Sequence, residues 1–341
     1  MSSMKPSEWA MLVVLSVFWG GSFFFIEVAL RGFQPFAIVF LRVVLAAIIL
    51  TGVVYLGGRR LPSTAGVWGS YFVMGALNNV IPFSLIVWGQ TRIDSGVASI
   101  LNATTPIFTV LLAHFLTSDE RLTLRKIVGV FIGFLGVYIM LQPELKDGFS
   151  WRGLGQVAVL GAAVSYSLAG IFGKRFKKTS PVVNAAGMLI CSSAIMLPLV
   201  LTTGALGLSR PTVFDVAALC GLATVSTAVA YLLYFRILAS AGATNVLLVT
   251  FLIPVGALLL GVGVLGEVIH ALEYAGMGCI FTGLMVIDGR VLSGIKNRVN
   301  SRQTKRSFRD MHPEAAKIEK APLSPAAGFS LRFNKRPRMK Q

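Results

Sequence analysis

The stretch SGVASILNATTPIFTVLLAHFL, from Ser95 to Leu116, is an apolar run of membrane length that contains a proline, Pro106. A second run, from Ala243 to Leu265, carries Pro254 at 148 positions further along the chain. A proline inside a helix removes one backbone hydrogen bond and kinks the helix, and membrane proteins tolerate such kinks. The two prolines therefore predict hinges at equivalent places in two related parts of the chain.

The same offset recurs along the whole apolar part of the sequence. Landmark residues lie 146 or 147 positions apart in the pairs Trp19 and Tyr166, Pro35 and Pro181, Gly75 and Gly221, Trp88 and Tyr234, Glu120 and Glu267, Gly129 and Gly276, and Gly136 and Gly283. Each half holds an odd number of apolar runs, so the second half would cross a membrane in the opposite direction to the first. Inverted repeats of this kind are typical of secondary transporters.

The composition indicates a lipid environment. Hydrophobic residues make up 55% of the chain and charged residues 13%, and the mean hydropathy is +0.75. Only helices and closed barrels satisfy every backbone polar group in hydrocarbon, and the apolar runs are too long for barrel strands. The sequence therefore predicts an all-α integral membrane protein.

Ten runs are long enough to be transmembrane helices. Their expected bounds are Glu8–Leu30, Pro35–Leu56, Val67–Gly89, Gly96–Leu116, Thr123–Leu141, Gly153–Lys174, Val183–Thr202, Phe214–Ile237, Ala243–Leu265 and Ala271–Ile287. Two inverted five-helix repeats would then occupy residues 8–144 and 145–289, between an N-terminal segment, 1–7, and a tail, 290–341.

Lysine and arginine residues fall unevenly between these runs. If the N-terminus is cytoplasmic, eleven basic residues that precede the tail lie inside and five lie outside. Cytoplasmic loops of membrane proteins carry an excess of such residues. We therefore expect both termini in the cytoplasm of a multi-pass protein of the plasma membrane, which in bacteria is the inner membrane.

The tail contributes fourteen basic residues from Arg290 onward to a chain whose net charge is +17. It is polar, interrupted by prolines and poor in aromatic residues, which predicts a disordered cytoplasmic segment. One interpretation is a solvated topology anchor, and the alternative is contact between its basic residues and anionic lipid. We do not expect a nucleic-acid partner.

The sequence shows no catalytic or metal-binding pattern. Cys191, Cys220 and Cys279 lie within apolar runs without metal-ligand spacing, and the histidines are scattered. There is no G-x-x-x-x-G-K-[ST] loop for nucleotide phosphates. We therefore expect neither an enzyme nor a bound metal or cofactor.

Several of these stretches resemble a known family. WGGSFFFIEVAL (Trp19–Leu30), PFAIVFLRVVLAAIIL (Pro35–Leu50) and the run Ser95–Leu116 are similar to the first half of the drug/metabolite transporter superfamily, in particular its ten-helix EamA-type exporters. The likeness continues through E-R-L-T at Glu120–Thr123 and returns in the second half around Pro254 and the Gly-Glu pair at Gly266 and Glu267.

The resemblance covers residues 7–289, nearly the whole chain apart from its tail. It implies a membrane transporter built from two five-helix repeats, which moves a small metabolite by alternating access. The family's substrates include amino acids, nucleobases, sugars and toxic compounds, so the resemblance does not name the cargo.

Arg42 is the most informative polar residue in the apolar runs. It lies seven residues into the second run, roughly 10 Å below its outer end, where a charge is costly. We expect it either to bind an anionic group or control a gate, or to snorkel or form a structural ion pair. Glu27, near the outer end of the first run, is its expected partner; proton coupling, cation recognition and simple contact with interfacial water all stay open for that carboxylate.

Neutral polar residues would need partners if they faced lipid, so we expect them to face other helices or a wet cavity. They are Asn78, Asn79, Gln90, Asn102, Thr104, Thr105, Asn245 and Thr250. Some of them would only join helices. Asn78 and Asn79 are neighbours about 100° apart on a helix, so one should line the pathway while the other packs.

Aromatic residues complete the expected pathway. Trp19, Tyr166 and Tyr231 are candidates for a cavity wall that recognises a partly apolar metabolite by stacking or cation–π contact. Trp88 and Tyr234 are alternatively residues of the membrane interface. Glycines such as Gly129, Gly136 and Gly276 instead indicate close helix packing or dimerisation.

The favoured hypothesis is a secondary active transporter that exports a small metabolite, such as an amino acid, a nucleobase or a related compound. The alternative is a non-transporting membrane scaffold or receptor of the same fold. The expected partners are a small-molecule substrate and the lipid bilayer, and the sequence does not indicate an oligomeric state.

Overall fold

The computed structural model describes residues 4–117, 122–146, 150–176, 179–207, 210–241, 243–246 and 248–289. In these ranges the regular elements are all helices, which confirms the all-α prediction. The chain divides into two units, Met1–Gly289 and Arg290–Gln341. The predicted disordered tail lies outside the described residues, and so do Glu120 and Arg121 of the E-R-L-T stretch.

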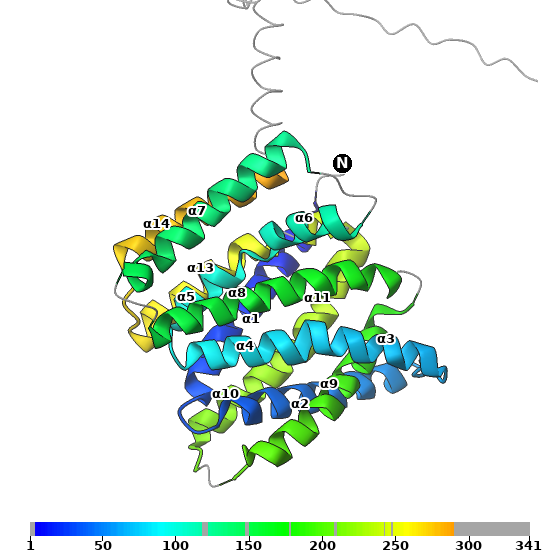
Figure 1. The fold of residues 1–341 in the computed structure, drawn as a ribbon. Coiled ribbons are helices and arrows are strands. Elements are labelled where there is room, and N and C mark those ends of the chain that lie inside the picture. Colours follow the sequence, from blue (N-terminus) through cyan, green and yellow to red (C-terminus); the bar gives the residue numbers. More distant parts are fainter. Residues whose placement is uncertain are drawn as a thin grey trace, which may run out of the picture. The chain divides into compact units, whose positions relative to one another are not determined.

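The helices follow one another along the described chain with short connections (Figure 1). Those of the first half are α1 (Pro6–Ala29), α2 (Pro35–Leu56), α3 (Ala65–Gly75), η1 (Ala76–Val80), α4 (Ile81–Gln90), α5 (Ser95–Asn102), α6 (Thr105–Leu116) and α7 (Leu124–Lys146). Those of the second half are α8 (Trp151–Phe172), η2 (Gly173–Phe176), α9 (Pro181–Thr203), α10 (Val213–Ala223), η3 (Thr224–Val229), α11 (Ala230–Ala241), α12 (Ala243–Val246), α13 (Val249–Leu260), η4 (Gly261–Leu265) and α14 (Ala271–Asp288).

Nine helical stretches in the described part of the chain are long and apolar enough to cross a membrane. They coincide with nine of the ten predicted runs. The tenth run, Ala243–Leu265, is divided: α12 ends at Val246, Leu247 is not described, and Val249–Leu265 is a shorter apolar stretch. The prediction of ten membrane-length spans therefore holds for nine in the described part of the chain.

Local sequence explains where several helices begin and end. Proline opens α1, α2 and α9 at Pro6, Pro35 and Pro181, where its fixed φ suits the first helical turn and its missing N–H leaves no hydrogen bond unmade. At the start of α10, Thr212 and Asp215 cap each other's backbone.

Pro106 does not interrupt a continuous helix, contrary to the expectation from the sequence. α5 ends at Asn102, a turn follows, and Pro106 lies in the first turn of α6. Pro254 does lie inside α13. The two prolines therefore occupy different positions in their helices, because the fourth run breaks just before its proline and α13 begins further upstream of Pro254.

Two of the membrane-length stretches contain π-helical turns. η1 joins α3 to α4, and η3 joins α10 to α11. Each π turn inserts an extra residue into the helix and so changes which side chains face the interior of the bundle. Such turns are frequent at functional sites. Both segments carry polar residues, Asn78 and Asn79 in η1 and Thr227 in η3.

The helices pack in pairs that join the two halves of the sequence. α7 packs along α14, α2 along α9, and α1 along α13, while α8 contacts α4, α5 and α6. Figure 1 shows the pairs α7 with α14 and α2 with α9 side by side.

Glycines allow the α7–α14 pair to approach closely. A Cβ atom added to Gly136 would lie 2.5 Å from the backbone oxygen of Gly276, and one added to Gly283 would lie 2.5 Å from that of Gly129. Such distances leave no room for a side chain. These glycines therefore allow two helices of the same chain to pack closely.

Glu267 also joins distant segments. Its carboxylate accepts hydrogen bonds from the backbone N–H groups of Ser95 and Gly96, both at 3.0 Å, and so caps the N-terminus of α5. A carboxylate is favourable there because the first N–H groups of a helix have no partner within the helix.

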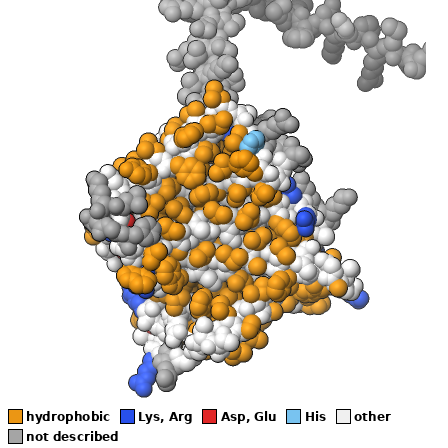
Figure 2. Space-filling view, viewed as in Figure 1, with side chains coloured by type: hydrophobic (Ala, Val, Ile, Leu, Met, Phe, Trp, Pro, Cys, Tyr) orange, Lys and Arg blue, Asp and Glu red, His pale blue; other side chains and the backbone are white. Residues whose placement is uncertain are grey.

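The surface has the character expected for contact with lipid. Hydrophobic side chains cover most of the face shown in Figure 2, and the lysine and arginine side chains lie toward its edges. Exposed apolar residues include Phe131, Leu259 and Phe115. Apolar exposure on this scale is unfavourable in water but not in a bilayer.

Candidate functional site

Arg42 lies at the meeting point of three helical segments. The side chain projects from α2 and is 5% exposed. Its Nε donates a hydrogen bond to the Thr227 hydroxyl of η3 at 2.8 Å, and the guanidinium carbon lies 3.6 Å from the ring centroid of Phe83 in α4. The hydrogen bond and the ring fix the position of the guanidinium.

Within the described residues Arg42 makes no ion pair, since both ion pairs found there belong to Arg152. The expected pairing of Arg42 with Glu27 is therefore wrong. Removing a charge from water is costly unless a partner or several hydrogen bonds compensate. Because Arg42 has no acidic partner among the described residues, its guanidinium retains N–H donors suited to a carboxylate, a phosphate or another anionic group.

Two tyrosines lie near this guanidinium, and one of them belongs to a network of hydrogen bonds. Tyr166 of α8 and Tyr231 of α11 lie close enough to Arg42 to interact with it electrostatically. The Tyr231 hydroxyl accepts a hydrogen bond from the Asn78 amide at 2.9 Å and donates one to the Asn79 amide oxygen at 3.0 Å. We call Arg42, Asn78, Asn79, Tyr166, Thr227 and Tyr231 the arginine cluster.

Asn78 and Asn79 converge on one hydroxyl, although the sequence predicts that they point in different directions. The π-helical turn of η1 and the length of the amide side chains bring both within reach of Tyr231. They differ in burial: Asn79 is fully buried and donates to the Ser192 hydroxyl at 2.9 Å, whereas Asn78 is half-buried.

The aromatic candidates separate into two places. Trp19 of α1 lies against Tyr234 of α11, with ring centroids 5.5 Å apart, and Tyr234 also contacts Phe235. Trp88 lies instead at the end of α4, where the Arg92 guanidinium is 5.9 Å from its ring. The structure therefore brings Trp19 and Tyr234 together and separates Trp88 from them.

Gln90 and Glu27 form a second polar site near the ends of α4 and α1. The Gln90 amide nitrogen donates to the backbone oxygen of Phe23 at 2.9 Å and to the Glu27 carboxylate at 3.4 Å. Both residues line two cavities of about 370 and 460 Å³.

The remaining candidates lie elsewhere in the bundle. Asn102 ends α5, and its buried amide oxygen has no hydrogen-bond partner among the described residues. Asn245 lies on α12 and donates to the backbone oxygen of Ala241 at 2.9 Å.

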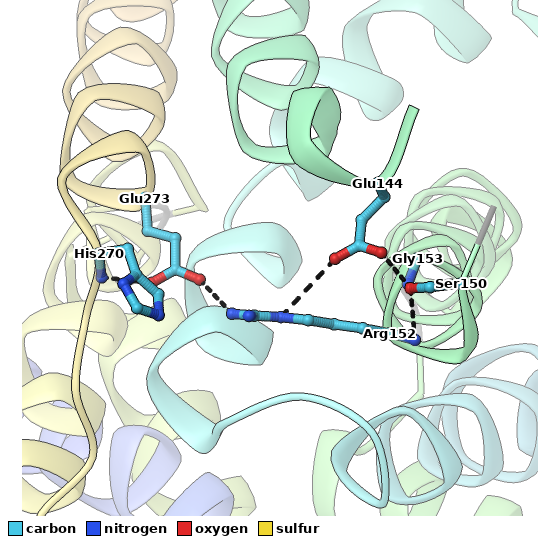
Figure 3. Close-up of polar contacts among 6 residues, drawn as sticks. All are labelled: Glu144, Ser150, Arg152, Gly153, His270 and Glu273. Carbon is cyan, nitrogen blue, oxygen red and sulfur yellow. Dashed lines mark hydrogen bonds and ion pairs between the residues drawn. The ribbon is translucent and has the colours of Figure 1, made fainter. Parts of the chain in front are cut away.

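A polar cluster that sequence reasoning missed joins three helix ends (Figure 3). Arg152, at the start of α8, binds Glu273 at 2.6 Å and lies 4.0 Å from Glu144 near the end of α7. Ser150 donates to Glu144, and Glu273 accepts from the His270 backbone N–H at 2.7 Å. Arg152 also lines the smaller cavity. Its sequence position indicated only a loop cation, because nothing in the chain reveals that these ends meet.

Phe83, Thr227 and Ser192 were likewise missed. A phenylalanine in an apolar run and hydroxyls in helices have no distinguishing signal in one sequence. Among the described residues no group of three histidine, cysteine or acidic side chains could hold a metal ion. The arrangement presents a buried cation, hydroxyls, amides and aromatic rings, which suits the recognition of a small polar molecule.

Comparison with known proteins places the chain in a family. The EamA-like transporter family matches it twice, over residues 7–142 and again over residues 153–288. A protein of Archaeoglobus fulgidus named as an uncharacterized transporter is 27% identical over 290 residues, which cover 82% of this chain and 98% of the relative.

Two further relatives have informative names. The uncharacterized inner membrane transporter YedA of Escherichia coli strain K12 is 24% identical over 284 residues, which cover 82% of this chain and 90% of YedA. A probable amino-acid metabolite efflux pump of Salmonella typhimurium is 26% identical over 293 residues, which cover 83% of this chain and 95% of the pump.

A solved crystal structure has a similar fold. Its TM-score is 0.61 at 18% sequence identity, and the match covers 83% of this chain and 99% of the other. A likeness at this identity concerns the fold alone. The two family matches, which together span most of the chain, and the nine membrane-length helices of its described part show a multi-pass membrane protein that belongs to the EamA-like transporter family.

Proposed function

We propose that this protein is a secondary active transporter that exports a small metabolite by alternating access, and that Arg42 binds an anionic group of the substrate. The observation that carries the proposal is a buried guanidinium that has no acidic partner within the described residues. A substrate carboxylate or phosphate would compensate the buried charge. Amino acids, nucleobases and related compounds are the candidate cargo, and the name of the Salmonella typhimurium relative supports the first of these.

An inverted-repeat architecture is part of the proposal. Helices at equivalent places in the two halves make equivalent contacts: α7 meets α14, α2 meets α9, and the contact of α1 with α13 is matched by that of α8 with α6. The π-helical segments η1 and η3 also occupy equivalent places. These observations support ten spans in two five-helix repeats, residues 8–144 and 145–289.

The arginine cluster draws residues from both proposed repeats. Arg42 and the two asparagines come from the first, whereas Tyr166, Thr227 and Tyr231 come from the second. Relative motion of the repeats would make and break the contact between Arg42 and Thr227, and substrate binding would favour one arrangement. The proposed pathway also includes Trp19, Glu27, Gln90, Asn102 and Asn245. Its proposed hinges are Pro254, inside α13, and the turn that directly precedes Pro106 at the start of α6.

The proposed topology has both termini in the cytoplasm, because basic residues are more numerous on that side. The energy would come from a gradient of substrate or of a coupling ion, since the sequence has no nucleotide-binding loop. A bacterial inner membrane is the proposed location, which the name of the Escherichia coli relative supports.

The test is flux through purified protein in liposomes. Labelled amino acids, nucleobases and small aromatic compounds are offered as pools, with and without a proton gradient, and the active pool is then resolved. Saturable flux that Arg42→Ala abolishes supports the proposal. Flux that is equal in the Arg42→Ala protein contradicts the role of Arg42. Absence of flux for every pool, from folded protein, favours the alternative of a membrane scaffold or receptor.

A further inference from the structure

Two cavities at one end of the bundle share part of their lining. Glu27, Gln90 and Thr91 line both. Their volumes, about 370 and 460 Å³, lie in the range that holds small organic molecules. Leu30, Phe33 and Pro35 give the larger cavity an apolar wall beside these polar groups.

The polar groups shared by the cavities have unused capacity to accept hydrogen bonds. Gln90 is 3% exposed, its amide nitrogen is committed to Phe23 and Glu27, and its amide oxygen is buried without a partner among the described residues. Glu27 makes no ion pair in the described part of the chain, and its contact with Gln90 is long at 3.4 Å. A ligand that complements two acceptors must itself be a donor.

The surrounding charges favour a cation. The carboxylates of Glu267 and Asp94 and the guanidinium of Arg31 act on Glu27 electrostatically. Among the charged groups that act on Glu27, two acids therefore outnumber one base. Arg31 is exposed and forms no ion pair with Glu27 within 4.0 Å.

Two further arginines, Arg92 and Arg152, line the smaller cavity, and each has a contact of its own. The Arg92 guanidinium lies over the Trp151 ring at 4.7 Å, and Arg152 is bound to Glu273 at 2.6 Å, as Figure 3 shows for Arg152. Neither arginine is paired with Glu27, so the carboxylate is left for a ligand.

We propose that Glu27 and Gln90 form an ammonium site that takes the protonated amine of a small organic ligand, whose apolar part lies against Leu30, Phe33 and Pro35. A hard metal cation fits less well, because it requires about six oxygen ligands and these two side chains provide fewer. The identification of this ligand as cargo rests on the proposed transport function; the binding site itself does not.

The test measures binding of phenethylammonium to the full-length protein in detergent by isothermal titration calorimetry. Phenethyl alcohol, which has the same apolar body without the charge, is the matched ligand. Glu27→Gln removes the charge at nearly constant shape, Glu27→Asp retains it, and Gln90→Met removes the free acceptor. Glu8→Gln makes the same change in a buried carboxylate at the opposite end of α1. Circular dichroism and melting temperature establish that each variant is folded.

We expect saturable binding of the amine and at least about tenfold weaker binding of the alcohol, because an ammonium–carboxylate contact is charge-assisted. Glu27→Gln and Gln90→Met should weaken amine binding, whereas Glu27→Asp and Glu8→Gln should retain it. Equal binding of amine and alcohol would overturn the proposal, and so would unchanged affinity in Glu27→Gln. A last measurement compares sodium chloride with choline chloride at equal ionic strength as competitors of the amine. If only sodium chloride weakens amine binding, the site belongs to an inorganic cation instead.

The binding result and the flux result are separable. If the amine does not bind but Arg42-dependent flux is present, the ammonium site is wrong and the transport function stands. If the amine binds as expected but no metabolite pool is transported, the site stands and the transport proposal fails.

Discussion

The Nε of Arg42 lies 2.8 Å from the hydroxyl oxygen of Thr227, a residue 185 positions away in the chain. The contact joins α2 of the first half to η3 of the second, deep in the bundle. Thr227 in turn donates to the backbone oxygen of Leu222 at 2.8 Å, five residues earlier, as the wider π-helical turn allows. The π turn thus positions the hydroxyl that holds the buried cation.

Arg42→Ala is expected to reduce transport by at least about tenfold, because a charge-assisted contact to the substrate would be lost. Arg42→Lys should retain part of the activity, since it keeps the charge but loses the planar donor geometry. Arg236→Ala, which changes an exposed arginine of α11, is the matched control and should transport normally. Initial rates in liposomes check these outcomes, and equal rates for Arg42→Ala and Arg236→Ala would contradict the role of Arg42.

Thr227→Val should impair both stability and transport. The substitution keeps the shape of the side chain but removes the acceptor of the Arg42 Nε, and an unsatisfied buried group costs about 1–3 kcal/mol. Thr227→Ser should restore most of the loss, because it keeps the hydroxyl. Melting temperature and flux are measured for the three proteins. A Thr227→Val protein that matches Thr227→Ser in both would show that the hydrogen bond is dispensable.

Asn79→Ala should destabilise the fold more than Asn78→Ala. Asn79 is fully buried and connects Ser192 to Tyr231. Its removal takes a donor from the buried Ser192 hydroxyl and an acceptor from the hydroxyl of the half-buried Tyr231, whereas Asn78 is itself half-buried. The expected loss for Asn79→Ala is about 1–3 kcal/mol. Thermal unfolding in detergent compares the two variants, and the reverse order of stability would be inconsistent with the network described.

Gly283→Ala should lower the melting temperature, whereas Gly278→Ala on the same helix should not. A Cβ on Gly283 would lie 2.5 Å from the backbone oxygen of Gly129, but one on Gly278 meets nothing within 4 Å. Overpacking against backbone costs typically about 1–3 kcal/mol. Similar melting temperatures for both variants would mean that the α7–α14 contact is looser than the structure indicates.

Pro254→Ala should slow transport turnover more than it weakens substrate binding. Pro254 lies inside α13, where the substitution permits a backbone hydrogen bond that proline cannot make, and so stiffens the proposed hinge. Pro106→Ala should have a smaller effect, because Pro106 lies in the first turn of α6. Concentration-dependent flux separates turnover from KM, and a loss confined to KM would argue against the hinge.

Much of the fold could be predicted from hydropathy. The run Pro35–Leu56 coincides with α2, and the other eight predicted runs that form membrane-length helices differ from them by a few residues at their ends. The run Ala243–Leu265 shows the limit of the method, because hydropathy averaged over a window does not detect a local departure from the helix. The same reason explains the turn at Ala103 and Thr104, which separates α5 from α6 ahead of Pro106.

The sequence indicated which types of residue form the candidate site, but not which side chains they contact. A single arginine inside an apolar run is recognisable as costly, and the structure does bury Arg42. Its assigned partner was wrong: Glu27 contacts Gln90, while Arg42 contacts Thr227 and Phe83. Arg152 and Glu273 lie 121 positions apart in the sequence, and neither stands out from the other charged residues near helix ends.

The sequence by itself determined that this protein is a helical membrane protein with two related halves, because membrane insertion depends on the hydrophobicity and length of each segment taken separately. The tertiary structure alone decided which polar side chains meet. Those encounters depend on the rotation of each helix about its axis, on the π turns of η1 and η3 and on the close approach of helix pairs such as α7 and α14. Hydropathy describes each segment separately, so it does not show how one segment packs against another.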